Sequence, residues 1–200
     1  MASSDTAIAN LALTKVGDLR ITNLTDNTKP AREILAIYDM MRDKLQRTYN
    51  WRFCVKRVQL AAEVDTPVFE YENQYPIPSD CLRILQVGDY YPAPDLSDLI
   101  SGSGAEYQLE GNKILTYDSG PLNLRYLSRV TDPTQFDPAF DDAFASLLAF
   151  NVCEALTQSS QKKESALRDY RLALSDAIRS NAIESPPESL ADTTWISVRL

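Results

Sequence analysis

The stretch PAREILAIYDMMRDKLQRTYNWRFCVKRVQLAA, residues 30–62, decides the fold because its hydrophobic period changes at Asn50. Before Asn50 the apolar side chains recur at steps of three and four, which predicts a helix over residues 30–49. After Asn50, Val and aromatic residues alternate with polar ones, which is typical of a strand over residues 51–62. We therefore expect a helix that leads directly into a β region.

The segments that follow extend this β region to residue 130. Apolar and aromatic runs predict strands over residues 69–78, Cys81–Val87 and 122–130, and residues 106–117 predict a hairpin that turns at Gly111-Asn112. Residues 90–104 contain two prolines and two glycines among small polar residues, which predicts a long loop. Residues 51–130 are thus expected to form a mostly antiparallel β region.

Helical patterns lie on both sides of the β region. One covers residues 5–16, with Ser4 or Asp5 as a possible N-cap and Gly17 at the expected C-terminal position. Two more begin at Asp137-Pro138 and at Ser160, the second ending near residue 181. Because helices at both ends of the chain can share a core only if the β region is an insertion, the sequence predicts an α+β fold.

The predicted organisation has three parts. Residues 1–50 and 131–183 form an α-helical bundle from the N- and C-terminal helices. Residues 51–130 form an inserted, mainly antiparallel β lobe. Residues 184–200 follow Pro186-Pro187 and form an extended C-terminal arm.

Composition excludes several functional classes. The chain has 200 residues, no histidine and three cysteines without a CxxC spacing, which argues against His-dependent catalysis and against common zinc sites. We therefore expect no enzyme activity, no catalytic residues, no metal and no cofactor. No run of about 18 apolar residues exists, and the N-terminus lacks the features of a signal peptide, so we expect no membrane association and assembly inside a cell.

Charge is unevenly distributed along the chain, whose net charge is −8. Between Lys29 and Arg57 there are eight basic and three acidic side chains, whereas between Val58 and Asp118 there are eleven acidic and two basic ones. The basic stretch has three interpretations: a solvated helix face, a DNA contact, or a contact with the acidic β region of a neighbouring copy. The candidate residues for the last interpretation are Arg42, Arg47, Arg52, Lys56 and Arg57.

Several conspicuous residues have an ordinary structural explanation. Trp51 and Phe53 at the period change are expected in the core rather than at an interface. Asp80 precedes a strand and is expected to serve a turn, and Asp141-Asp142 suits the positive end of a helix. A catalytic carboxylate pair of the glycan-hydrolase type would need two acids roughly 5–10 Å apart, and the sequence singles out no such pair.

The most specific residues resemble the head-to-tail adaptor proteins of short-tailed bacteriophages, of the tail tubular protein A type. The resemblance rests on ALTKVGDLRITNL at residues 12–24, on residues 31–61 with the run NWRF, and on YPIPSDCLRILQV at residues 75–87. A two-helix C-terminal region and a final segment with a Trp and an Arg complete it. These matches span most of the chain.

The resemblance implies a structural connector at the head–tail junction of a virion. It implies a homo-oligomeric, dodecameric ring, assembled in the host cytoplasm, that binds the portal protein and the tail nozzle protein. Such a ring would extend the DNA channel, help to retain the genome and let packaged double-stranded DNA pass without specific binding. A virion-associated glycan hydrolase with a carboxylate pair is the alternative hypothesis, and a DNA-binding regulator is disfavoured by the acidic balance.

The sequence also suggests where the partners implied by this resemblance bind. The C-terminal arm is expected to dock on the portal through its apolar and arginine side chains, which are Leu190, Trp195, Ile196, Val198 and Arg199. The long loop is expected to contact the nozzle through its aromatic and leucine side chains, which are Tyr90, Tyr91, Leu96 and Leu99. The basic stretch named above is expected at the subunit interface.

Overall fold

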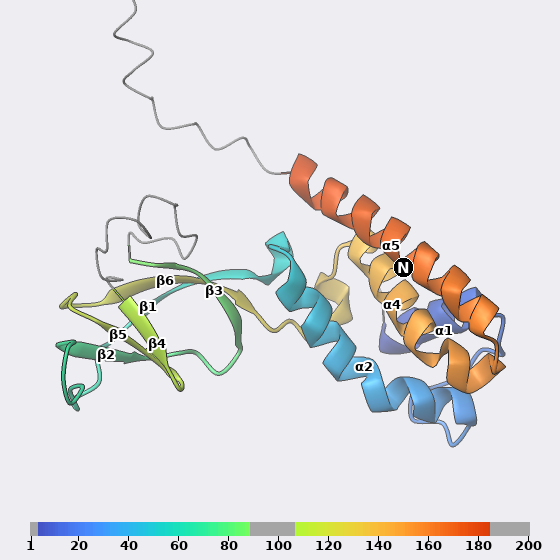
Figure 1. Cartoon of the computed structure of the whole chain (residues 1–200), viewed down its shortest axis with the longest axis horizontal. Coiled ribbons are helices and arrows are strands. Elements are labelled where there is room, and N and C mark those ends of the chain that lie inside the picture. Colours follow the sequence, from blue (N-terminus) through green and yellow to red (C-terminus); the bar gives the residue numbers. More distant parts are fainter. Residues whose placement is uncertain (1–3, 89–106, 185–200) are drawn as a thin grey trace, which may run out of the picture.

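The computed structural model of the chain describes residues 4–88 and 107–184 and has the expected α+β architecture (Figure 1). A helical bundle occupies one end of the molecule and a β lobe the other. The helices are α1 (Asp5–Val16), α2 (Lys29–Thr48), α4 (Pro138–Thr157) and α5 (Ser160–Ile183). Helices from both ends of the chain pack together, since α4 contacts α1, α2 and α5. The inserted position of the β lobe is therefore confirmed.

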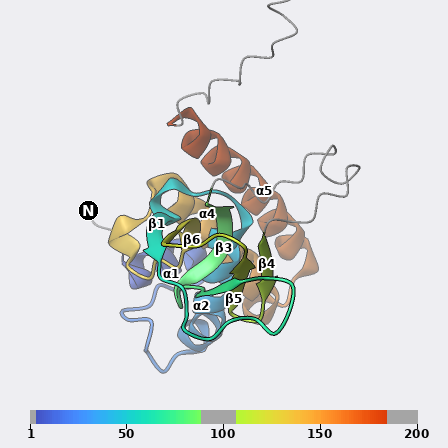
Figure 2. The same ribbon diagram turned by 90° about the vertical axis from the view of Figure 1, so that its left-hand side faces the viewer.

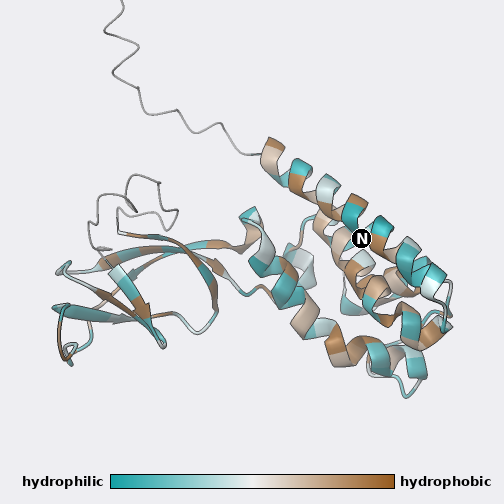
Figure 3. Cartoon of the chain, in the orientation of Figure 1, coloured by the Kyte–Doolittle hydropathy of each residue, from teal (hydrophilic) through white to brown (hydrophobic). Residues whose placement is uncertain are grey.

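Helix α4 forms the centre of the bundle because it is apolar on nearly every side. Phe140, Phe144 and Leu148 are fully buried, and small residues such as Ala143 and Ala145 let the neighbouring helices approach. Figure 3 shows hydrophobic residues spread along α4 but interspersed with hydrophilic ones along α5. Only Ala177 of α5 is buried, so α5 covers the bundle from outside.

The helix ends follow local capping chemistry. Ser4 and Thr28 cap α1 and α2 by accepting hydrogen bonds from the backbone N–H groups of Ala7 and Ala31. Asp137 caps α4 in the expected way, but the cap of α5 is Ser159 rather than Ser160. Ser159 accepts from the N–H of Lys162, so Ser160 becomes the first helical residue.

The β lobe consists of two three-stranded antiparallel sheets, which Figure 2 views from the lobe end. One sheet has the order β1 (Val55–Leu60), β6 (Leu122–Ser128), β3 (Cys81–Val87), and the other β2 (Asn73–Pro76), β5 (Lys113–Thr116), β4 (Tyr107–Glu110). The hairpin of β4 and β5 turns at Gly111-Asn112 as predicted, with Gly111 at φ +57°. A separate core fills the lobe; its buried residues are Leu60, Tyr75, Val87, Ile114, Leu122, Leu124 and Tyr126.

Three predicted strands are shorter than expected, and β6, which ends at Ser128 rather than at residue 130, is the least affected. Residues Arg52–Cys54 form a 3-10 turn, so β1 begins only at Val55. The strand expected over residues 69–78 reduces to Asn73–Pro76, because Glu70 adopts a left-handed conformation with φ +67° that interrupts an extended chain. Residues 61–72 consequently form a wide loop at the end of the lobe that is far from the bundle (Figure 1).

The end of α4 leads to a stability prediction. Gln158, an exposed residue, closes α4 in the left-handed region at φ 52°, whereas α1 ends with Gly17 at φ 80° in the same role. Because glycine adopts this region without strain, Gln158→Gly should raise the free energy of unfolding by about 0.5–1 kcal/mol. Gly17→Ala should lower it by about 1 kcal/mol. Urea denaturation measures both, and equal signs for the two variants would contradict the assignment.

Candidate functional site

The basic stretch predicted at a subunit interface is divided in the structure among three environments. Arg42 lies inside the subunit, Arg47 and Arg52 lie where α2 meets the β lobe, and Lys56 and Arg57 lie on β1. These environments differ in burial and in the partners of each cation.

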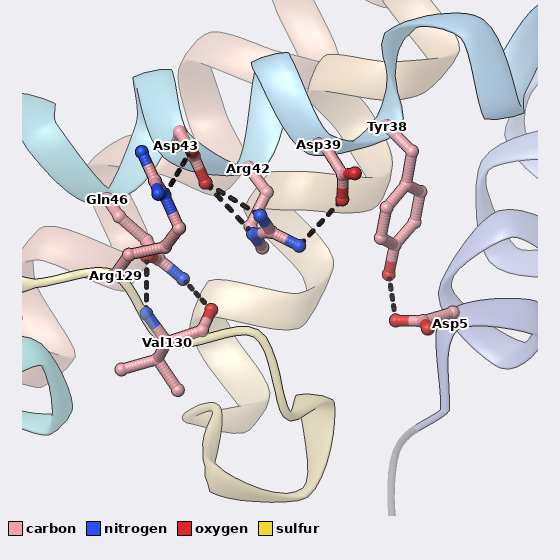
Figure 4. Close-up of polar contacts among 8 residues, drawn as sticks. All are labelled: Asp5, Tyr38, Asp39, Arg42, Asp43, Gln46, Arg129 and Val130. Carbon is pink, nitrogen blue, oxygen red and sulfur yellow. Dashed lines mark hydrogen bonds and ion pairs between the residues drawn. The ribbon is translucent and has the colours of Figure 1, made fainter. Parts of the chain in front are cut away.

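Arg42 is committed to contacts within its own chain (Figure 4). Its side chain is only 7% exposed, and its guanidinium binds Asp39 at 2.7 Å and Asp43 at 2.8 Å. The second carboxylate oxygen of Asp43 accepts a hydrogen bond from Arg129 at 2.7 Å. Arg129 lies on the chain segment that leaves the β lobe after β6. Arg42 therefore helps to join the lobe to α2, a role that sequence alone does not distinguish from an exposed basic face.

Gln46, one turn further along α2, makes a second connection to the chain leaving the lobe (Figure 4). Its side-chain amide donates to the carbonyl of Val130 at 2.8 Å and accepts from the N–H of Val130 at 3.1 Å. Gln46 is fully buried, so these two bonds replace the water that both backbone groups would otherwise bind. In the middle of α2, Tyr38 donates to Asp5 of α1 at 2.9 Å.

Cationic side chains gather at the junction between α2 and β3. Arg47 donates to the carbonyl of Leu82, and Arg83 donates to the side chain of Asn50, so both hydrogen bonds end on neutral acceptors. Burial lowers the pKa of Arg83, and the positive charge of Arg47 lowers it further. Arg52 lies next to this group, and its backbone N–H donates to the side chain of Asn181 of α5 at 3.0 Å. Neutral groups of the same chain therefore hold Arg47 and Arg83 at this junction.

Lys56 forms a polar cluster with Asp80 and Tyr126 across the sheet. The Lys56 ammonium binds one carboxylate oxygen of Asp80 at 2.8 Å, and the Tyr126 hydroxyl donates to the other at 3.0 Å. Burial works to raise the pKa of Asp80, but the hydrogen bonds from Lys56 and Tyr126 outweigh it and hold that pKa below its ordinary value. Asp80 lies in a turn in which the N–H of Cys81 donates to the carbonyl of Pro78 at 2.9 Å, and the Asp80 carbonyl accepts from the N–H of Arg129 at 2.7 Å.

The depressed pKa of Asp80 predicts a pH dependence of stability. A carboxylate with a lowered folded-state pKa stabilises the fold above its unfolded pKa, and this contribution is lost as pH falls through the folded pKa. Asp80→Asn should therefore lower stability at neutral pH by about 1 kcal/mol or less, since the pair is partly exposed. The difference from wild type should shrink in acid, as followed by urea denaturation at several pH values. A constant difference would contradict the role of the Asp80 charge.

Arg57 lines a hollow on the sheet formed by β1, β6 and β3. The hollow has a volume of about 360 Å³, and its lining residues are Arg57, Val58, Gln59, Gln86, Gly88, Asn123, Leu124 and Arg125. Arg57 lies directly opposite Arg125 across the strand pair. Side chains alternate along β6, so Asn123 and Arg125 face away from the lobe core, to which Leu124 and Tyr126 belong. We call this site the Arg57 hollow.

Sequence reasoning identified Arg57 but missed the other polar residues of the hollow. The available signal was the alternation of Arg57 with Gln59 and of Asn123 with Arg125, which places polar groups on one face of each strand. What the sequence could not indicate is that β1 and β6 are neighbours, because 61 residues separate their facing ends, Leu60 and Leu122.

The described parts of the chain contain neither a cysteine thiol with a lowered pKa nor a cluster of metal-binding side chains. Burial raises the pKa of the Cys54 thiol to about 12 and that of Cys81 to about 11, so both are protonated at neutral pH. Within residues 4–88 and 107–184, no group of three or more His, Cys, Asp or Glu side chains is placed to bind a metal ion. No helix in these ranges is both long and apolar enough to cross a bilayer.

The two other predicted sites lie outside the described residues. These are the portal-binding residues Leu190, Trp195, Ile196, Val198 and Arg199, and the nozzle-contact residues Tyr90, Tyr91, Leu96 and Leu99. They remain predictions from the sequence.

Comparison with known proteins adds no relative to this description. No protein-family model matches the chain, and a search of curated proteins finds no significant match.

Proposed function

We propose that the chain is a structural head-to-tail connector of a short-tailed phage virion. In this role, copies form a ring that joins the portal to the tail nozzle, extends the DNA channel and helps to retain the packaged genome. The proposed site is the virion tail at the head–tail junction, and the proposed partners are portal protein, nozzle protein and further copies of the chain.

The observation that carries the proposal is the junction at Asn50, where the run NWRF leads from α2 into the β lobe. This run is the most specific element of the resemblance to tail tubular adaptors. Trp51, the second residue of this run, is buried, and Gln46, Arg47 and Asp43 bind chain segments of the lobe. Such a junction holds two lobes in a defined orientation, which suits a protein that must transmit position from one ring to the next.

Charge supports the same function. A lumen that lets DNA slide should not bind phosphates tightly, and tight binding requires a concentrated positive surface. The chain carries a net charge of −8, and Arg42, Lys56 and Arg129 are engaged by carboxylates of the same subunit. Arg47, Arg52 and Arg57 are exposed and are the proposed contacts with a neighbouring copy.

The carboxylates around this junction favour the connector over the glycan hydrolase. Asp39 and Asp43 both bind Arg42, and Asp80 binds Lys56 and Tyr126. A retaining or inverting hydrolase instead presents two carboxyl groups on opposite sides of a sugar. These acids act as partners of cations in the fold.

Removal of the C-terminal arm tests the proposal. Among the described residues the bundle core extends from Ile8 to Ala177, so a chain that ends at residue 183 should keep its urea midpoint. It should, however, lose retention on cognate portal rings, as measured by co-sedimentation and electron microscopy. The full-length variant Trp195→Ala/Ile196→Ala should lose retention too, whereas Leu172→Ala, at an exposed apolar position of α5, should not. Wild-type retention by the truncated chain would overturn the proposed docking.

A further inference from the structure

The outer face of α5 carries cations that the rest of the subunit leaves unengaged. Arg168, Arg171 and Arg179 are exposed, and the helical period places them on the side of α5 that faces away from the buried Ala177. Within residues 4–88 and 107–184, no hydrogen bond or ion pair involves the side chain of any of these three arginines. Arg168 and Arg171 are one turn apart, and like charges at that spacing repel each other. A partner that brings anions is therefore favoured on this face.

Apolar side chains lie among these arginines. Leu172 is 66% exposed and Ile183 is 78% exposed, both on the same outer side of the helix. Asp169 and Asp176 flank this side along one edge. We call the face the α5 stripe, which is about 22 Å long; its residues are Arg168, Arg171, Leu172, Arg179 and Ile183. A surface that is both cationic and apolar suits a partner with carboxylates and exposed apolar groups.

The loop of residues 61–72, here called the lobe-tip loop, has this complementary chemistry. Val64 is 99% exposed, Val68 96% and Phe69 74%, and apolar groups gathered on one loop indicate a contact surface. The loop contains no Lys or Arg. Its exposed acidic side chains, which no cation of the described chain binds, are Asp65, Glu70 and Glu72.

We propose that the lobe-tip loop of one copy docks on the α5 stripe of a second copy. The lobe-tip loop lies at the end of the lobe that is far from the bundle, so it does not reach α5 of its own subunit (Figure 1). The two surfaces are different patches of the same chain, so the contact is heterologous, and its closed repetition produces a ring. The inference rests on the proposed connector function for its biological setting and deepens it by naming surfaces through which neighbouring copies meet.

The α5 stripe leads toward residues already proposed to meet a neighbouring copy. Near the end of α5, the side chain of Asn181 accepts from the N–H of Arg52 at 3.0 Å and donates to the carbonyl of Asn50 at 3.1 Å. The end of the stripe therefore lies beside Arg52, and one neighbour can cover both.

Helix α2 offers a weaker match than α5. Its exposed apolar residues Leu35 and Met40 are 48% and 60% exposed, less than their counterparts on α5. Two of its exposed cations, Arg32 and Arg47, each donate a hydrogen bond to a group of their own chain. Charge complementarity with the acidic loop therefore favours α5.

A second copy fits the α5 stripe better than a nucleic acid does. Phosphate groups would bind the arginines but would leave Leu172 and Ile183 exposed, and the chain has a net charge of −8, which disfavours DNA binding. The lobe-tip loop instead brings carboxylates and covers the apolar side chains of both surfaces in one contact.

Charge reversal on the α5 stripe tests the first surface. Sedimentation velocity over the soluble concentration range should show association of wild type, and added salt should weaken it because opposite charges meet. The α5 variant, Arg168→Glu/Arg171→Glu/Arg179→Glu, should associate at least about tenfold more weakly. The matched control makes the same charge change at exposed positions elsewhere and should stay within about threefold of wild type; it is Arg20→Glu/Arg32→Glu/Lys44→Glu.

A charge swap tests whether the two surfaces meet each other. The loop variant, Asp65→Lys/Glu70→Lys/Glu72→Lys, should also associate at least about tenfold more weakly than wild type. A chain that carries the substitutions of both variants has the wild-type net charge of −8 and again pairs a basic surface with an acidic one. This swapped chain should therefore associate more tightly than either variant alone. A swapped chain that stays as weak as both variants would overturn the inference.

Further variants separate folding from contact. If the α5 variant unfolds in urea below the wild-type midpoint, Arg168→Gln/Arg171→Gln/Arg179→Gln takes its place and should also weaken association. Leu172→Ala keeps all three arginines and should change association by less than about threefold, because leucine is under-represented among the residues that dominate interface energies.

The remaining outcomes distinguish this contact from the connector function. A monomeric wild type, or a control as weak as the α5 variant, would overturn the inference. Binding of duplex DNA that is lost in the α5 variant would place a nucleic acid on α5 and would also overturn it. Association of copies without retention on portal rings would overturn the connector function alone. Retention of a monomeric wild type on portal rings would overturn only the contact.

Discussion

Replacement of Trp51 by alanine should lower the free energy of unfolding by about 3–5 kcal/mol, the range typical of a buried large aromatic residue. Trp51 is 1% exposed and packs its ring against Phe140 of α4, with a centroid distance of 5.1 Å, and against Tyr49 at 5.6 Å. Alanine would leave a cavity where the end of α2, the start of α4 and the entry to the β lobe meet.

A lost hydrogen bond adds to the effect of the cavity. The indole N–H of Trp51 donates to the carbonyl of Leu45 at 2.8 Å. Leu45 is in the last turn of α2, where the backbone carbonyls have no hydrogen-bond partner within the helix. The indole of Trp51, six residues further along the chain, supplies the donor for the Leu45 carbonyl. In the alanine variant this buried carbonyl would lose its donor, at an additional cost of about 1–3 kcal/mol if no water replaces it.

Urea denaturation followed by far-UV circular dichroism measures the loss without relying on tryptophan fluorescence. Phe69→Ala is the matched control, because it removes an aromatic ring that is 74% exposed and should change stability by no more than about 0.5 kcal/mol. If Trp51→Ala and Phe69→Ala had similar small effects, Trp51 would not be the central residue of the junction.

Gln46→Met should lower the free energy of unfolding by about 2–5 kcal/mol, although methionine has a similar length and no branching. The substitution leaves the N–H and the carbonyl of Val130 buried without partners, and each unsatisfied group costs about 1–3 kcal/mol. Because Val130 lies two residues after the end of strand β6, the variant should also loosen the β lobe from α2.

Two measurements separate this effect from a general loss of packing. Urea denaturation gives the change in stability, and amide hydrogen exchange reports the Val130 N–H directly, which should exchange faster in the variant under native conditions. Arg129→Gln is the control, since it removes a partly exposed ion pair with Asp43 from the adjacent residue and should cost about 1 kcal/mol or less. Unchanged Val130 protection in Gln46→Met would contradict the assigned role.

Features that depend on nearby residues were predictable from the sequence. The caps at Ser4, Thr28 and Asp137, the glycine that ends α1 and the turn at Gly111-Asn112 each involve residues within about four positions of one another. The spacing of hydrophobic residues likewise depends on local backbone geometry. The change from helical to strand spacing at Asn50 therefore located the boundary between the helical bundle and the β lobe. The core position of Trp51 followed from the same pattern.

Other features were decided by contacts between residues far apart in the chain. Arg42 belongs by its charge to an exposed helix face, yet it is buried and shares Asp43 with Arg129, which follows β6 in the chain. Gln46 has no apolar signal, and only the position of Val130 explains its burial. The sequence alone determined the α+β class and the order of elements, because these follow from local propensity and period. The tertiary structure decided which strands pair, which cations are neutralised within the subunit and which polar groups share the Arg57 hollow, because those outcomes depend on long-range packing that no local pattern contains.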